Sequence, residues 1–265
     1  MKRTALKLSY CFIIPILCVY IPSCSLGSTK DKADTDHQHK HSVTELQADF
    51  RQFRQFLEES HPKLYSFTSE RTFDSLFDYH YQLINHSMTT QEFYSILIPL
   101  VARVGCGHTS LWTPEGYWEQ VPQGMFPMRV HSRNGQIFAI PGYNNETPGK
   151  PGSRIISING QDADSMVIEM IHNIWSDGFI LTKRYQRLNQ VFPYLYALNF
   201  GFPEQFEIVI LEDGKEKQIK MNPVSRTIVD TYIDSLFAPG GARNPGIKLE
   251  LVDDQSAMLT IGSFA

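Results

Sequence analysis

The 265-residue sequence lacks the short motifs that mark common metal, nucleotide and redox sites. It contains no His-Glu-x-x-His zinc motif, no glycine-rich phosphate loop and no Cys-x-x-Cys pair. It also lacks an excess of basic residues, because the formal net charge is −4, so no positively charged face for nucleic acid is implied. We therefore expect no cofactor, no metal ion and no nucleic-acid partner.

Long hydrophobic runs are also scarce, and the longest lies at the start of the chain. A basic start is followed by an apolar stretch over residues 10–22, which Pro15 interrupts. The stretch is too short to span a bilayer comfortably, and with its basic flank it is typical of a secretory signal peptide. It ends in Ile21-Pro22-Ser23-Cys24, which resembles the lipobox of bacterial lipoproteins, although that pattern prefers a small residue at Pro22. An ordinary signal peptide with an incidental cysteine is the alternative.

The sequence has only four cysteines, and their positions agree with export. Cys11 and Cys18 would leave with residues 1–23, and the lipobox resemblance implies that Cys24 becomes the acylated N-terminus. Cys106 is then alone, so we expect no disulfide within the mature chain. A doubly or triply acylated cysteine anchors a protein stably. We expect a protein anchored through this lipid to a membrane of the bacterial cell envelope.

Residues 24–42 are predicted to form a flexible tether between the lipid and the folded part. The stretch is polar and poor in apolar residues. His37, His39 and His41 alternate within it, which would allow metal binding, but solvated side chains on a tether are the simpler interpretation.

Three helices are predicted next, over about residues 43–104. Ser42 with Glu45, and Thr89 with Glu92, match the capping box that opens a helix. The second helix is predicted to begin near Ser69. Their apolar residues recur at helical spacing and indicate a shared core.

Two residues are expected to shape the third helix. Pro99 lies inside its apolar stripe and should kink it, and Gly105 is a natural C-terminal stop.

Strand and helix patterns alternate from residue 116 to residue 221. Two strands are predicted within residues 128–140, around Asn134-Gly135, and a short buried strand is predicted before Asn159-Gly160. Helices are predicted over residues 163–175 and 180–198, and a hairpin around Asp213-Gly214. Residues 247–265 predict a last hairpin, which we expect to be poorly packed because two strands alone are marginally stable.

Several short motifs follow one another along the chain. They are Ser60-His61-Pro62-Lys63-Leu64-Tyr65, Phe73, Met88-Thr89 with Glu92-Phe93-Tyr94, Gly107-His108-Thr109-Ser110-Leu111, residues 151–160 and residues 257–264. In this order they resemble the helical N-terminal region, the PDZ-like domain and the first core strand of bacterial lipoproteins of the tail-specific, or C-terminal processing, protease family. The resemblance covers residues 42–265.

The resemblance implies an α+β fold made of successive parts. A helical subdomain covers residues 43–115, a PDZ-like mixed domain covers residues 116–223, and residues 224–265 form the first hairpin of an incomplete, truncated protease core. The family hydrolyses peptide bonds with a serine nucleophile, activated by a lysine or by a histidine in a tricorn-like tetrad. No serine or lysine of this chain matches those motifs, and no Gly-x-Ser-x-Gly elbow is present.

His108 is the catalytic candidate that the resemblance supplies. Tricorn-type members carry a Ser-His pair near this point, and here Gly107 replaces the serine while His108 matches the histidine. A histidine is suited to act as general base. Alternatively, the glycines cap the helix and His108 makes a structural hydrogen bond to a backbone carbonyl. A nucleophilic pair of Cys106 and His108 is a third possibility, weakened because no orienting acid is evident.

Two functions follow as expectations. The first is the N-terminal part of an exported serine-type peptidase that acts on proteins or peptides and is inactive alone. The alternative is a non-catalytic PDZ-like lipoprotein that binds peptides by strand addition. Its carboxylate loop would lie nearest to Gly124-Met125-Phe126-Pro127, where Pro127 removes a donor.

Overall fold

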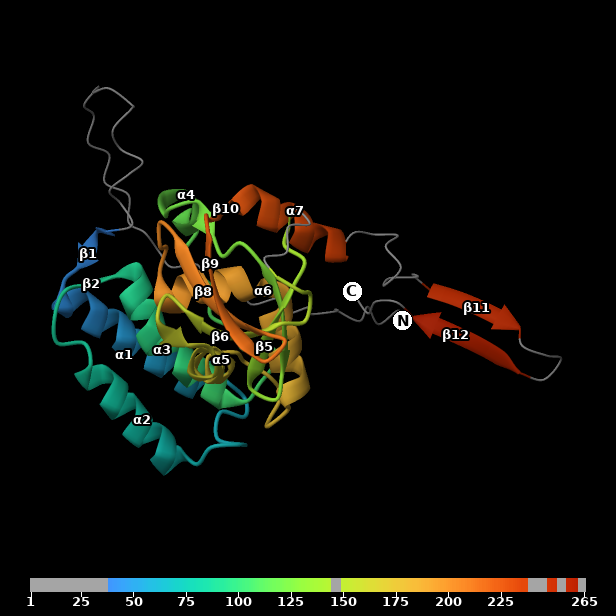
Figure 1. The fold of residues 1–265 in the computed structure, drawn as a ribbon. Helices are drawn as coiled ribbons and strands as arrows, with labels where there is room; N and C mark the ends of the chain where they lie inside the picture. Colours follow the sequence, from blue (N-terminus) through green and yellow to red (C-terminus); the bar gives the residue numbers. More distant parts are fainter. Residues whose placement is uncertain (1–37, 144–148, 238–246, 252–255, 262–265) are drawn as a thin grey trace, which may run out of the picture.

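The computed structural model describes residues 38–143, 149–237, 247–251 and 256–261 (Figure 1). Helices and antiparallel strands are both present, and they follow one another as a helical part and a mixed part, which confirms the predicted α+β class. None of the helices in these ranges is both long and apolar enough to cross a bilayer. The predicted leader and Cys24 lie outside the described residues.

The N-terminal part consists of three helices whose starts were predicted correctly. They are α1 (Val43–Ser60), α2 (Glu70–Gln82) and α3 (Thr90–Val104). Ser42 and Thr89 each complete a capping box, and the Ser69 hydroxyl accepts the N–H of Thr72 at the start of α2. Their apolar stripes meet in one helical core that includes Phe50, Phe73, Phe77 and Leu100.

The end of the predicted tether takes part in the fold. Lys40–His41 form β1, which pairs antiparallel with β2 (Met88–Thr89). A ring nitrogen of His41, Nε2, lies 3.1 Å from the hydroxyl of Thr90. Residues before the capping box at Ser42 therefore take part in regular structure, because the backbone of β2 supplies a hydrogen-bonding partner that the tether composition does not reveal.

An antiparallel sheet of order β4-β5-β6-β8-β9 forms the centre of the mixed part, with β7 paired to β6. Its strands are β4 (Arg129–Arg133), β5 (Gln136–Ile140), β6 (Arg154–Ile158), β7 (Gln161–Asp162), β8 (Phe206–Glu212) and β9 (Lys215–Met221). All three predicted Asn-Gly or Asp-Gly turns are present. In each, both residues have positive φ: 52° and 79° at Asn134-Gly135, for example. This is the geometry of tight hairpin turns, which asparagine and glycine tolerate best.

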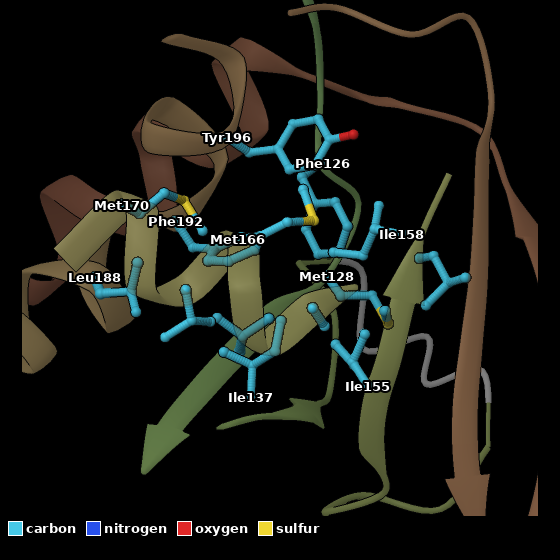
Figure 2. Close-up of a cluster of buried hydrophobic side chains, with 14 of the residues drawn as sticks. Phe126, Met128, Ile137, Ile155, Ile158, Met166, Met170, Leu188, Phe192 and Tyr196 are labelled. Carbon is cyan, nitrogen blue, oxygen red and sulfur yellow. The ribbon is translucent and has the colours of Figure 1, made fainter. Parts of the chain in front are cut away.

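Two helices cover one face of this sheet and form the second core. They are α5 (Ala163–His172) and α6 (Leu181–Phe200). Figure 2 shows side chains of the strands and helices pointing toward one another, among them Ile155 of β6 and Phe192 of α6, together with Phe126 from the segment before β4. Phe126 contacts the rings of Phe192 and Phe206 edge to face, a favoured aromatic geometry.

Prolines act differently in the two long helices. α3 runs through Pro99 as one helix, whereas α6 departs from helical geometry at Val191, with φ −126° and ψ 28°. Val191 lies two residues before Pro193, whose ring hinders the preceding turn. The sequence predicted a helical stretch over residues 180–198 and did not anticipate this break.

Residues 224–237 pack against the preceding part. β10 (Val224–Ser225) pairs with β3 (Gly124–Met125), which follows the short helix α4 (Tyr117–Gln120). The helix α7 (Arg226–Phe237), absent from our sequence expectations, places Val229 in full burial against Met125 and Ala197. The short β10 and α7 thus pack against elements that precede residue 223, where the sequence placed a boundary.

The last described strands, β11 (Ile247–Leu251) and β12 (Ala257–Ile261), form the expected hairpin. Figure 1 shows the hairpin clear of the other elements. Its apolar side chains are exposed, for example Leu251 at 82% and Ile247 at 76%. The prediction of a poorly packed terminal hairpin is therefore confirmed.

Candidate functional site

His108 lies just beyond the C-terminal end of α3, where a glycine turns the chain. Gly105 has φ 68° and ψ 32°, the left-handed conformation that ends many helices. A Cβ atom at this position would lie 2.9 Å from Cδ2 of Phe67. The backbone conformation and the packing of Phe67 both require glycine, so the predicted helix stop is confirmed.

A second segment, the loop between α5 and α6, meets this turn. The N–H of Gly178 donates to the carbonyl of Gly105 at 2.8 Å. Gly178 also has positive φ, 52°, and its Cβ would lie 2.9 Å from Cε1 of the same Phe67 ring. The ring of Phe67 thus covers two glycines from distant parts of the chain and holds the two segments together.

The loop is also fixed from the side of α6. The hydroxyl of Ser176 is fully buried and accepts a hydrogen bond from Nε of Arg184 at 2.8 Å. These contacts bring the adjacent Asp177 to residues 106–108.

Asp177 binds the backbone beside His108. Its Oδ1 accepts the N–H of Gly107 at 2.7 Å, and Nζ of Lys183 donates to the carbonyl of Gly107 at 3.3 Å. A Cβ on Gly107 would lie 2.7 Å from Asp177 Oδ2 and closer still to Lys183 Nζ. This contact gives a physical reason for a glycine at position 107.

Three potential ligand or catalytic groups meet at this corner: the thiol of Cys106, the imidazole of His108 and the carboxylate of Asp177. One donor atom from each lies within 4.8 Å of the other two, and no second group of this kind occurs among the described residues. Cys106 is half-buried against the helical core, while His108 and Asp177 are exposed. No hydrogen bond joins the three side chains, and the His108 ring bonds to no described residue.

This arrangement bears on the three interpretations of His108. The expected structural hydrogen bond to a backbone carbonyl is not among the contacts of the described residues. An acidic side chain that the sequence did not place near His108 is Asp177, which lies 70 residues from Gly107 along the chain. No sequence signal links the two positions, because the contact depends on how the loop between α5 and α6 meets the turn after α3.

The two segments that carry the cluster also carry aromatic side chains. Trp112 packs edge to face on Trp175 with ring centroids 5.8 Å apart, and Phe67 does so on Phe179 at 5.9 Å. Trp112 is 66% exposed and Phe179 80%, and Ile180 beside it is exposed as well. An accessible apolar surface therefore adjoins the polar corner.

The other predicted sites are less complete. His39 and His41 contact each other edge to face, but no third described ligand residue joins them. His37 lies outside the described residues. The candidate carboxylate loop is already engaged, because Gly124 and Met125 pair with β10 and Phe126 is buried.

Comparisons with known proteins provide no identification. No protein-family model matches the chain, and no curated protein matches it. The chain is similar to two solved structures of CPAF, a chlamydial serine protease. A serine-to-alanine mutant shares 8% identity at a TM-score of 0.48, and the mature protein shares 11% at 0.44.

The chain spans about two fifths of the length of these CPAF chains, since the matches cover 76% of this chain and 40% and 39% of those. Identities and TM-scores this low carry no argument about function.

Proposed function

We propose that this chain is the N-terminal part of an exported serine-type peptidase that acts on proteins or peptides, with His108 as its general base. The observation that carries the proposal is the meeting of His108 and Asp177 at an exposed corner. The motif resemblance implies that the serine nucleophile belongs to a core outside the printed sequence. The chain alone is then inactive.

The geometry supports a division of roles. His108 takes the proton of the serine hydroxyl as the oxygen attacks the peptide carbonyl, and returns it to the leaving amine. Asp177 stabilises the imidazolium and orients the ring. One carboxylate oxygen is held by Gly107 N–H, which leaves the other free for the imidazole. Catalytic hydrogen bonds commonly shorten only when the site is complete.

The exposure of His108 and of apolar side chains near it also supports docking of a separate protease core at this corner. His108 is exposed, and so are the apolar side chains of Trp112, four residues after it, and Phe179, two residues after Asp177. Such a surface suits docking of an apolar face.

The role of His108 as general base can be tested in a chimera that joins residues 1–265 to the serine-bearing core of a tail-specific protease. We expect His108→Ala to lower the kcat for a fluorogenic peptide by about 10²–10⁴-fold, the usual value of general-base catalysis. Asp177→Asn should lower kcat in the same direction. His131→Ala, an exposed histidine on β4, is the matched control and should leave kcat unchanged.

Unchanged turnover by His108→Ala would contradict the catalytic role. If the parent chimera turns over no peptide, labelling of its serine by a fluorophosphonate gives a second reading, because that reaction also needs the base. Labelling at equal rates with and without His108 would then contradict the role.

The alternative, a peptide-binding lipoprotein without catalysis, receives less support. A peptide strand added along Gly124 and Met125 on that side would have to displace β10, which already pairs with both residues. Arg226 N–H also donates to the carbonyl of Gln123 at 2.9 Å. We therefore retain the peptidase proposal.

The proposal includes a lipid anchor at Cys24 in the cell envelope. Its basis is the lipobox-like Ile21-Pro22-Ser23-Cys24 after the apolar leader. In a bacterial host, a clickable fatty acid should label the chain, and Cys24→Ser should abolish the label while Cys106→Ser retains it. Full labelling of Cys24→Ser would refute the anchor.

A further inference from the structure

We propose that Cys106, His108 and Asp177 form a binding site for a thiophilic divalent cation, with Zn²⁺ as the best fit. The sequence predicted no metal site, because the three donors are divided between two segments and no familiar ligand spacing is present. The fold places them together.

The donor set has the chemistry of a zinc site. Thiolate sulfur, imidazole nitrogen and carboxylate oxygen are the ligands that Zn²⁺ takes in proteins. The thiolate and carboxylate together balance the two positive charges of the ion. Three protein ligands leave the fourth tetrahedral position for water.

The three donor atoms need to move only slightly closer together to bind a zinc ion. In a tetrahedral zinc site the donor atoms lie about 3.4–3.6 Å apart, which follows from bond lengths of about 2.0–2.3 Å. Here the donor atoms lie within 4.8 Å of one another. His108 and Asp177 are exposed and can move inward by about 1 Å through side-chain rotation alone.

The backbone around the site is already fixed. The bond from Gly178 N–H to Gly105 carbonyl, at 2.8 Å, joins the two ligand-bearing segments. The bond from Gly107 N–H to Asp177 Oδ1 orients the carboxylate. Ligating carboxylates are commonly held by an outer hydrogen bond of this kind.

One nearby charge opposes a cation. Nζ of Lys183 donates to the Gly107 carbonyl at 3.3 Å and therefore lies beside the cluster. Like charges repel, so this ammonium weakens metal binding without preventing it. It also provides a test, because removing the charge should strengthen binding.

A consequence for activity rests on the proposed peptidase function. A metal ion on His108 occupies the lone pair that a general base needs. Metal binding and peptidase activity at His108 would then exclude each other, so that Zn²⁺ would inhibit the complete enzyme. The metal site itself does not depend on that function.

Titration of the whole reduced chain with Co²⁺ tests the site. We expect one equivalent to produce a thiolate-to-Co²⁺ charge-transfer band in the near ultraviolet, together with the visible bands of tetrahedral Co²⁺. Zn²⁺ should displace it and remove both signals. Cys106→Ser and His108→Ala should abolish the charge-transfer band or weaken binding by at least about tenfold.

Matched variants separate this site from other donors of the chain. His41→Ala removes a tether histidine and should leave the band unchanged, while Lys183→Met should tighten binding. Thermal melting shows whether each variant is folded. The absence of the band in the parent chain, or its persistence in folded Cys106→Ser, would overturn the proposal. Either result leaves the peptidase proposal intact, because no catalytic step is measured.

Discussion

Two nearby glycines at the end of α3 serve different purposes. Gly105 is required by its own backbone, since its φ of 68° is the left-handed conformation and Phe67 covers the place of a Cβ. Gly107 has no such conformation, but the absence of a side chain makes room for the carboxylate of Asp177. The first glycine thus serves folding, and the second serves the site.

Alanine at each glycine should therefore have different effects. We expect Gly105→Ala to lower the free energy of unfolding by about 1–2 kcal/mol from the left-handed backbone alone, and by more from the clash with the Phe67 ring. Gly107→Ala displaces only the ends of two flexible side chains and should cost less than about 1 kcal/mol. Urea unfolding measures both.

The effect of the two substitutions on metal binding should have the opposite order. Gly107→Ala moves Asp177 away from its backbone partner and should therefore weaken Co²⁺ binding more than Gly105→Ala does. A larger loss of stability for Gly107→Ala than for Gly105→Ala would contradict these roles.

At the scale of elements, the helices begin where local chemistry sets them. The Ser42 hydroxyl accepts the N–H of Glu45, and the Glu45 carboxylate accepts the N–H of Ser42 at 2.9 Å. Both bonds form between residues three apart, so the sequence alone predicts them. Kinks are less local, because α3 and α6 both contain proline and only α6 breaks.

Two serine-to-alanine variants test the value of the cap. Ser42→Ala should lower the free energy of unfolding by about 1 kcal/mol, since an N–H at the start of α1 loses its acceptor. Ser75→Ala, inside α2, removes a hydroxyl that bonds to the Arg71 carbonyl and should be neutral or slightly stabilising. Chemical denaturation compares them, and equal losses would contradict a specific cap effect.

At the scale of the whole molecule, the candidate site lies where two cores meet. Cys106 packs against the helical core, whereas Asp177 follows α5 of the core built on the sheet. The amide of Gln91 in α3 also donates to the carbonyls of Ala197 and Leu198 in α6. Any shift between the two parts would therefore separate Cys106 and His108 from Asp177.

The C-terminal segments should contribute unequally to stability. Deletion of residues 238–265 removes the exposed hairpin and should leave the melting temperature of the rest nearly unchanged. Deletion of residues 224–265 also removes β10 and the fully buried Val229. It should cost about 2 kcal/mol or more.

Differential scanning calorimetry of the two shortened chains measures this difference. A large fall in the melting temperature after the shorter deletion would show that the hairpin packs against the remaining fold, contrary to its exposure here.

The sequence by itself determined the helix caps, the tight turns, the poorly packed last hairpin and the position of His108 after a helix stop. These features depend on residues a few positions apart, so their chemistry is visible in the printed chain. Only the tertiary structure decided that Asp177 lies beside Cys106 and His108, and that β10 covers Gly124 and Met125. Those contacts join segments far apart in the chain, and the packing of α3, α5 and α6 brings the first of them together.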